Sequence, residues 1–218
     1  NQNAAALAAD KLLEDEGLAA KLAAATAEAP VVVAVLSQDA TSESVTGRTT
    51  GFVNRFVELA GAYGVVEVQG HTNWAVAAEN PAIILHVEIG ASPRIDDMTN
   101  AANAVLNKNN LAALFISNEG AVAGVLAATA DGSEFGEGGR FNGILVGGFD
   151  AGAPQKNAVR NGWFAGSVTQ DPYRIGYLAV ELAVKAANGE AVEDVDTGAQ
   201  WYTKDNIDEP NIALLVYD

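Results

Sequence analysis

Apolar, largely β-branched runs alternate with helical patterns along most of the chain. The clearest runs are residues 31–36, 83–89 and 111–116. Continuous runs of this kind are typical of strands that are buried on both faces of a parallel sheet. Parallel neighbours need crossover connections, and the helical patterns between the runs can supply them. The alternation therefore predicts an α/β fold with a mainly parallel sheet flanked by helices.

The remaining elements follow from the same patterns. We expect further strands at 65–69, 144–149, 164–168 and 212–217, and helices at 4–27, 49–62, 95–106, 121–130, 155–161 and 173–188. Gly17 is a candidate break in the first helix. Residues 67–80 predict an inserted connection with a short helical pattern, and residues 189–210, which are acidic and lack apolar periodicity, predict an irregular excursion across the surface.

Charge and composition exclude several classes of protein. The chain has 12 Lys and Arg against 28 Asp and Glu, a net charge of -16, and such a surface repels phosphate backbones and anionic lipid. We therefore expect no nucleic-acid partner. Cys is absent, which excludes disulfides and thiolate metal sites. No apolar run is long enough to cross a bilayer, so we expect no direct membrane insertion.

Polar side chains follow the predicted strands at their carboxyl ends, where open parallel sheets bind ligands. Ser37, Asn118, Asp150 and Gln170 all lie in such positions. Their hydroxyl, amide and carboxylate groups suit a neutral polyol, because each sugar hydroxyl both donates and accepts a hydrogen bond. Helix capping is the alternative for Asn118, Asp150 and Asp171. The repetition of the pattern at several strands favours a ligand edge.

The chain carries no motif for catalysis, a metal or a cofactor. The Gly-rich residues 136–140 lack the Lys-Ser/Thr of a phosphate loop. His71 and His86 have no evident third metal ligand, and no G-x-S-x-G nucleophile elbow occurs. We therefore expect no catalytic residues, no metal and no cofactor, and a protein that is not an enzyme.

Several short motifs, in order along nearly the whole chain, resemble one family. They are Gly148-Phe149-Asp150, Phe115-Ile116-Ser117-Asn118-Glu119, Val168-Thr169-Gln170-Asp171-Pro172-Tyr173 with Gly176-Tyr177, and Arg48-Thr49-Thr50-Gly51-Phe52. This set resembles the type I periplasmic sugar-binding proteins, the ribose-binding protein class of ABC transporter solute receptors. Members of that family have two similar lobes joined by three chain crossings, and the resemblance covers one lobe.

The resemblance implies a division of the chain. Residues 1–170 would form the second, C-terminal ligand-binding lobe. Residues 171–195 would be a helix that returns to a first, N-terminal lobe that is missing here, and residues 196–218 would be a crossing segment and a closing strand. The expected fold is thus one lobe of the two-lobe type I periplasmic-binding-protein fold.

The resemblance also implies site residues. Asn118, Asp150 and Gln170 match polar ligand contacts of the family's second lobe. The family's ligand arginine falls at Thr46 by the ribose-binding pattern, whereas Arg48 matches the R-x-x-G-F register. The family's aromatic wall falls near Ser92, which is not aromatic, so that Trp74 or His71 from the inserted segment could supply a flat face instead.

The function that this resemblance implies is a sugar receptor. It would hold a monosaccharide between two lobes by hinge closure and dock on the membrane permease of an ABC transporter, as a periplasmic protein or a cell-surface lipoprotein. The alternative is the effector-binding domain of a lactose-repressor-type transcription regulator, which has the same fold. A hydrolase or isomerase on the same sheet is a third class, without a positive signal. The strong negative charge and residues 168–173 favour the receptor.

Overall fold

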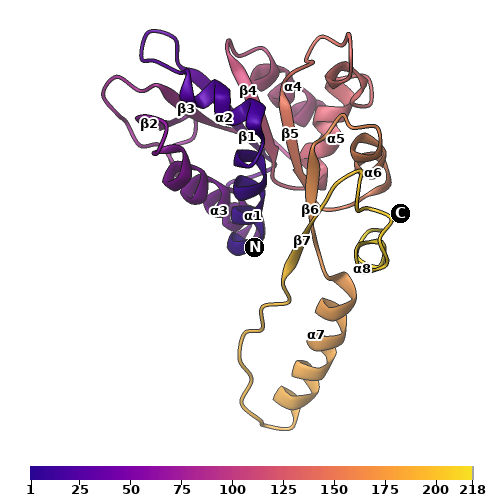
Figure 1. Ribbon diagram of the computed structural model, residues 1–218. Helices are drawn as coiled ribbons and strands as arrows, with labels where there is room; N and C mark the ends of the chain where they lie inside the picture. The colour runs from indigo at the N-terminus through magenta and orange to yellow at the C-terminus, as the bar shows by residue number, and fades with distance from the viewer. Residues whose placement is uncertain (218) are drawn as a thin grey trace.

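A seven-stranded sheet forms the centre of the computed structural model, which describes residues 1–217 (Figure 1). Its order is β2-β3-β1-β4-β5-β6-β7. The strands are β1 Val31–Ser37, β2 Val66–Gln69, β3 Ile83–Ile89, β4 Leu111–Ile116, β5 Leu145–Phe149, β6 Gly166–Gln170 and β7 Ala199–Tyr202. Strands β1 to β6 pair in parallel, and β7 pairs antiparallel with β6. The predicted α/β class with a mainly parallel sheet is confirmed.

Helices cover both faces of the sheet. They are α1 Gln2–Leu13, α2 Glu16–Ala23, α3 Glu43–Ala60, α4 Ile95–Leu106, α5 Glu119–Ala128, α6 Ala153–Arg160, α7 Pro172–Ala187 and α8 Pro210–Ala213, with a 3-10 turn at Ser133–Phe135. Apolar side chains of α1, α2 and α3 form one buried cluster with the sheet, and those of α4, α5, α6 and α8 form a second cluster on the opposite face. Both faces of the strands are therefore buried, as their continuous apolar runs predict.

The first helical segment is two helices, not one. Helix α1 ends at Leu13, and Asp15 begins α2 by accepting a hydrogen bond from the backbone N–H of Leu18 at 2.8 Å. The break thus lies just before the expected position, Gly17, because Asp15 is an effective helix N-cap. Alanines on one side of α1 are fully buried against α3, which brings the two backbones close together.

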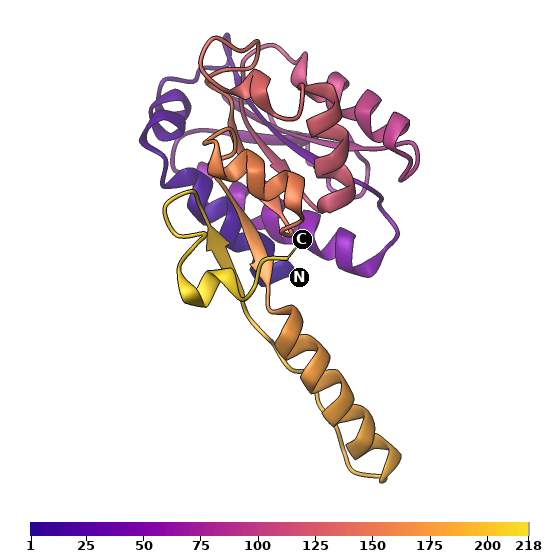
Figure 2. The ribbon, with the colours of Figure 1, turned by 90° about the vertical axis from the view of Figure 1, so that its right-hand side faces the viewer.

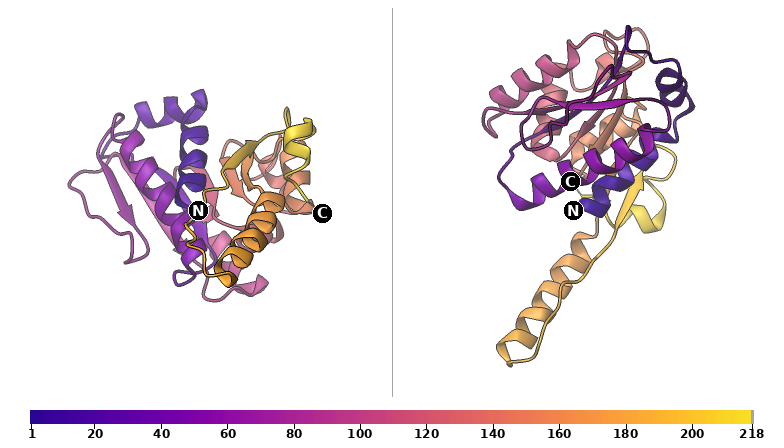
Figure 3. Two further views of the ribbon diagram at one scale, coloured as in Figure 1. Left: turned by 90° about the horizontal axis from the view of Figure 1, so that it is seen from below. Right: turned by 90° about the vertical axis from the view of Figure 1, so that its left-hand side faces the viewer.

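Helix α7 and the segment that follows it project from the body as an arm (Figures 1 and 2). No residue of α7 is buried. Its large apolar side chains are exposed, with Tyr173 at 79%, Val180 at 66% and Tyr177 at 62% of their full accessible surface. The views in Figure 3 show the same arm leaving the edge at which the parallel strands end. The helix has the apolar residues of a packed element but, within residues 1–217, no sheet to pack on.

The C-terminal segment differs from the sequence prediction. The expected strand at 212–217 is wrong: Pro210 begins the short helix α8, and Ile212 inserts into the second apolar cluster. The sheet edge beside β6 is instead occupied by β7, which lies in the segment predicted to be irregular. Asp218, the last residue of the expected crossing segment, lies outside the described residues.

The inserted segment at 67–80 contains β2 and a turn, not the short helix that its pattern predicts. Val76 forms an antiparallel bridge with Val68 and so covers the outer edge of β2. This protects an edge strand that would otherwise present unpaired backbone groups. Within residues 1–217, no helix has both the length and the apolar character needed to span a membrane.

Candidate functional site

Three side chains that the sequence singled out meet at the carboxyl edge of the sheet. Arg48 comes from α3, Asp150 follows β5, and Gln170 ends β6. The Arg48 Nη1 donates to the Asp150 carboxylate at 3.0 and 3.2 Å, and its Nη2 donates to the Gln170 Oε1 at 3.3 Å. Residues far apart in the sequence are thus joined by one guanidinium group.

Arg48 is fixed on every side. Its Nη1 also donates to the carbonyl oxygen of Ser117 at 3.2 Å, and its Nε donates to the Oδ1 of Asn1 at 3.2 Å. The guanidinium carbon lies 3.9 Å from the ring centroid of Phe149, a cation–π contact. The Arg48 side chain is only 11% exposed. Arg48 therefore binds groups of this chain and cross-links Asp150, Gln170, Ser117 and Asn1.

Asp150 has an unusual backbone. Its φ of 78° lies in the left-handed region, which is uncommon for residues other than glycine. Its carboxylate Oδ2 accepts a hydrogen bond from the backbone N–H of Glu119 at 2.9 Å, at the start of α5. A guanidinium group and a helix N-terminus thus share the negative charge of one carboxylate.

Asn118 forms a second polar pair at the same edge. Its Nδ2 donates to the Oε1 of Gln38 at 2.7 Å. Gln38 directly follows β1. Although Asn118 is the N-cap residue of α5, its side chain makes no capping hydrogen bond. A side chain at Gly120 would collide with Gln38, so this glycine leaves room for the amide pair. The capping alternative for Asn118 is therefore wrong.

Buried hydroxyl groups lie beneath this edge. Ser117 donates to the Oγ of Ser37 at 2.9 Å, and Thr49 lies 3.0 Å from the same oxygen. All three residues are fully buried. They link the carboxyl ends of β1 and β4 to helix α3, which carries Arg48. Sequence reasoning placed Ser37 at a strand end but gave no signal for this bridge.

Other expected site residues lie apart from this cluster. The Thr46 hydroxyl donates to the carbonyl of Ser42 at 2.8 Å, and the Ser92 hydroxyl donates to the Asp97 carboxylate. Trp74 is 9% exposed, and its indole N–H donates to the Thr50 hydroxyl at 2.9 Å.

The ring of His71 lies beside Trp74, with centroids 5.2 Å apart. Within residues 1–217 no hydrogen bond joins Thr46, Ser92, Trp74 or His71 to Arg48, Asp150 or Gln170. Phe149, by contrast, was only part of a motif, yet it supplies the ring under Arg48.

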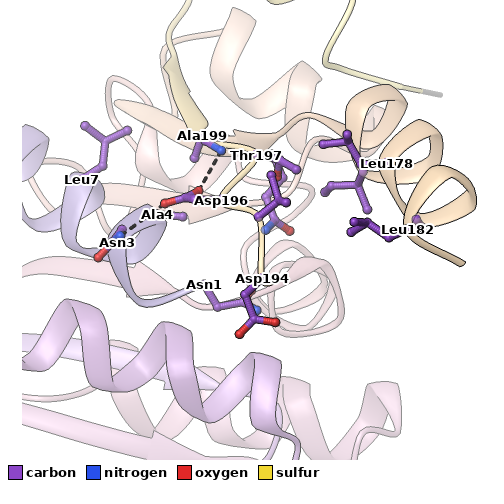
Figure 4. A pocket seen from close by; sticks show the side chains of 15 residues that line it. Asn1, Asn3, Ala4, Leu7, Leu178, Leu182, Asp194, Asp196, Thr197 and Ala199 are labelled. Carbon is purple, nitrogen blue, oxygen red and sulfur yellow. Dashed lines mark hydrogen bonds between the residues drawn. The ribbon is translucent and has the colours of Figure 1, made fainter. Parts of the chain in front are cut away.

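A groove of about 700 Å³ adjoins Gln170 where α1, α7 and the returning segment meet (Figure 4). Asn3 and Asp196 line it on one side, and Leu178 and Leu182 of α7 line the other. Asp196 accepts hydrogen bonds from the backbone N–H of Gly198 at 2.8 Å and from Asn3 at 3.4 Å. These bonds, the first above all, hold the pKa of Asp196 below its ordinary value.

The chemistry of this edge is that of hydrogen bonding. Carboxylate, amide and guanidinium groups converge there, and the charges of Arg48 and Asp150 offset each other. Within residues 1–217, no cluster of three or more His, Asp or Glu side chains is placed to hold a metal ion.

The sheet topology and the polar edge define an α/β domain of the class that carries ligands at the carboxyl ends of its strands. The model of the periplasmic binding protein domain matches residues 1–191. The chain therefore belongs to the periplasmic binding protein domain family. A search of curated proteins found no match.

Comparison with solved structures gives matches that cover the whole chain. The chain is 38% identical, with a TM-score of 0.83, to an ABC transporter, LacI family transcriptional regulator from Brachyspira murdochii, covering 100% of this chain and 65% of that one. It is 26% identical, with a TM-score of 0.68, to a carbohydrate transporter solute-binding protein from Agrobacterium radiobacter in complex with D-arabinose, covering 100% and 63%.

A solute-binding protein from Agrobacterium vitis with bound D-fucose has 23% identity and a TM-score of 0.69, covering 100% and 62%, and so shares the fold. The chain thus spans less than two thirds of the length of each of these proteins.

Proposed function

We propose that the chain is the second lobe, with returning segments, of a sugar receptor of an ABC transporter. The observation that carries the proposal is the cluster of Arg48, Asp150 and Gln170 at the carboxyl edge of the sheet. Arg48 offsets the charge of Asp150, so that this edge favours a neutral ligand over an anion or a cation. We assign ligand binding to Asp150, Gln170 and Asn118.

The hydrogen-bonding capacity left at the edge supports a polyol. Gln170 uses its oxygen on Arg48 and keeps its amide N–H groups as donors. Asn118 donates to Gln38, and its Oδ1, which lies 3.4 Å from the Ser117 hydroxyl, has a second acceptor position left. The Asp150 carboxylate has acceptor sites beyond those that Arg48 and Glu119 occupy. A sugar hydroxyl, which donates and accepts at once, complements this mixture.

We further propose that Arg48 binds the sugar only through Asp150 and Gln170. Thr46, Ser92 and Trp74 were expected near the ligand by analogy, and their hydrogen bonds to Ser42, Asp97 and Thr50 support a structural role for them in this lobe. Trp74 is mostly buried, which leaves little of its ring to lie against a sugar.

We propose the following division of the chain. Residues 1–170 would form the lobe proper, 171–195 would return to a first lobe, and 196–218 would cross back. The exposed apolar residues of α7 support this division, because a first lobe would bury them, and so does the greater length of the solved relatives. A sugar would then be enclosed by hinge closure, and the closed form would dock on a permease outside the cytoplasm, whether periplasmic or anchored as a lipoprotein.

A second candidate is the effector-binding domain of a lactose-repressor-type regulator. The printed name of the relative from Brachyspira murdochii, 38% identical, includes both an ABC transporter and a transcriptional regulator. The gene sequence upstream of Asn1 separates the two. A signal or lipoprotein sequence supports the receptor, and a helix-turn-helix supports the regulator.

Calorimetry tests the sugar proposal. The full-length protein is titrated with D-arabinose, D-fucose and a panel of other pentoses and hexoses, and Asp150→Asn serves as the binding-site variant. We expect one of the sugars to bind and the variant to bind it at least about tenfold more weakly, since a hydrogen bond to a charged group is lost. A folded protein that binds none of these sugars refutes the proposal.

A further inference from the structure

Two buried hydroxyl groups donate to the same backbone oxygen, the carbonyl of Asp150. The Tyr202 hydroxyl lies 2.9 Å from this oxygen, and the Ser167 hydroxyl lies 3.0 Å from it. Both residues are fully buried. The Nε2 of Gln155 donates to the Ser167 oxygen, which leaves the Ser167 proton directed to Asp150. The carbonyl of Asp150 is thus held from two sides.

The backbone of Asp150 needs such restraint. Its φ of 78° is unfavourable for a residue with a side chain. Its N–H donates to the carbonyl of Val168 at 2.8 Å, so that bonds fix the residue on both its N–H and its C=O sides. A residue in this region would otherwise relax toward an ordinary φ, and the relaxation would turn its side chain.

The direction of the Asp150 carboxylate depends on this conformation. In the left-handed conformation it reaches the guanidinium of Arg48 and the N–H of Glu119 together. Hydrogen bonds weaken steeply as they lose alignment, so a rotation of the Asp150 backbone would cost both contacts. Packing in the apolar core explains why the ring of Tyr202 is buried, but it does not explain why this position carries a hydroxyl group.

We infer that Tyr202, assisted by Ser167, is a positioning residue that holds the Asp150 carboxylate in place at the ligand edge. Tyr202 is the last residue of β7, the strand that follows the arm. Strand β7 pairs with β6, and in this pairing Tyr202 lies opposite Ser167. The segment that returns from the arm thus contacts the backbone of Asp150 through the Tyr202 hydroxyl. The role in ligand binding rests on the proposed function, whereas the restraint on Asp150 does not.

The test uses Tyr202→Phe, which keeps the ring and removes the hydroxyl. Thr129→Val is the matched control, because Thr129, which directly follows α5, is equally buried and donates to the carbonyl of Val125 at 2.7 Å. The readout is the NMR shift of the Glu119 amide proton during a pH titration, since this amide donates to the Asp150 carboxylate. The variant Asp150→Asn identifies the part of the shift that comes from Asp150.

We expect the Asp150-dependent shift change to shrink at least about twofold in Tyr202→Phe and to remain in Thr129→Val, because only the first loosens the Glu119–Asp150 hydrogen bond. An unchanged titration in a folded Tyr202→Phe overturns the inference. Ser167→Ala serves as a second variant if Tyr202→Phe does not fold, with the same expected result and the same refuting one.

Sugar binding by the full-length protein is the second readout. Where wild type binds D-arabinose or D-fucose, Tyr202→Phe should bind it about tenfold more weakly, with Thr129→Val near wild type. Equal affinity in Tyr202→Phe and wild type contradicts the role in binding. Where wild type binds no sugar, the proposed function fails, and the NMR titration still decides the restraint on Asp150.

Discussion

The guanidinium of Arg48 lies over the ring of Phe149, with 3.9 Å between its carbon and the ring centroid. Phe149 is followed directly by Asp150, the ion-pair partner of the same guanidinium. The Gly-Phe-Asp motif thus supplies both the face and the edge contact of one arginine, which itself begins the R-x-x-G-F motif. The Gly-Phe-Asp and R-x-x-G-F motifs are far apart in the sequence, but their residues Phe149, Asp150 and Arg48 contact one another.

Replacing Arg48 by methionine should therefore destabilise the domain. The variant leaves the mostly buried Asp150 carboxylate without its cation, and we expect a loss of about 2 kcal/mol in the free energy of unfolding by urea. Arg94→Met is the control, since the Arg94 side chain is 77% exposed and lies 4.0 Å from Asp96. The control should change stability by less than about 0.5 kcal/mol. Equal effects of the two variants would show that the Arg48 pair is not special.

Gly51 allows α1 and α3 to pack. A Cβ at this position would meet the backbone of Gln2, which belongs to α1 and cannot rotate away as a side chain could. We expect Gly51→Ala to cost about 1 to 3 kcal/mol of unfolding free energy through overpacking. A disturbed α1 would also move Asn1 away from Arg48.

Gly176→Ala is the matched control for Gly51→Ala. Gly176 lies in α7, and a Cβ there would meet nothing within 4 Å. Because alanine favours the helix over glycine, the helical content of α7 should rise and global stability should not fall. Circular dichroism during urea unfolding measures both, and a stable Gly51→Ala would contradict the packing argument.

The central elements of the fold are predictable because their residues carry one consistent signal. Strand β3 and helix α4 have the predicted bounds, Ile83–Ile89 and Ile95–Leu106. A continuous apolar run and a well-formed helical period each admit one structure when both faces of the sheet are covered.

The C-terminal segment is not predictable in this way. Residues 212–217 are as apolar as a strand, but the edge beside β6 is already filled by β7. In β7 itself, Trp201 and Tyr202 pack on opposite faces of the sheet, an alternation too short to stand out from the acidic residues around it. Which segment takes a sheet edge depends on tertiary competition.

The sequence predicts which residues lie at the candidate site better than it predicts the contacts between them. Asp150, Gln170 and Asn118 follow strands, and the topology of a parallel sheet brings such positions to one edge. The pairing of Arg48 with Asp150, and of Asn118 with Gln38, depends on side-chain directions. The sequence gives no sign of the left-handed conformation of Asp150, because positive φ values are usually marked by a glycine and this position is an aspartate.

The exposed face of α7 should make this chain self-associate. Tyr173, Tyr177, Val180 and Val184 recur at helical spacing and are all exposed. Sedimentation of the 218-residue chain should show concentration-dependent association that strengthens with salt, because the net charge of -16 opposes it. Tyr177→Gln with Val184→Gln should restore the monomer without loss of unfolding free energy, since neither residue is buried in the body. A wild-type chain that remains monomeric throughout would contradict this expectation.

Asp39 should give the domain an acid-sensitive contribution to stability. Its Oδ1 accepts hydrogen bonds from the backbone N–H groups of Ser42 at 2.6 Å and Thr41 at 2.8 Å. Partial burial acts in the opposite direction, but these bonds hold the pKa of Asp39 below its ordinary value of 3.8. Because the folded-state pKa is the lower one, the contribution is present above pH 3.8 and is lost as the pH falls through the folded-state pKa. Urea unfolding of wild type and Asp39→Asn should therefore show wild type more stable near neutral pH, with a difference that shrinks in acid. A difference that stays constant with pH would mean that the Asp39 carboxylate gains nothing from its ionised form.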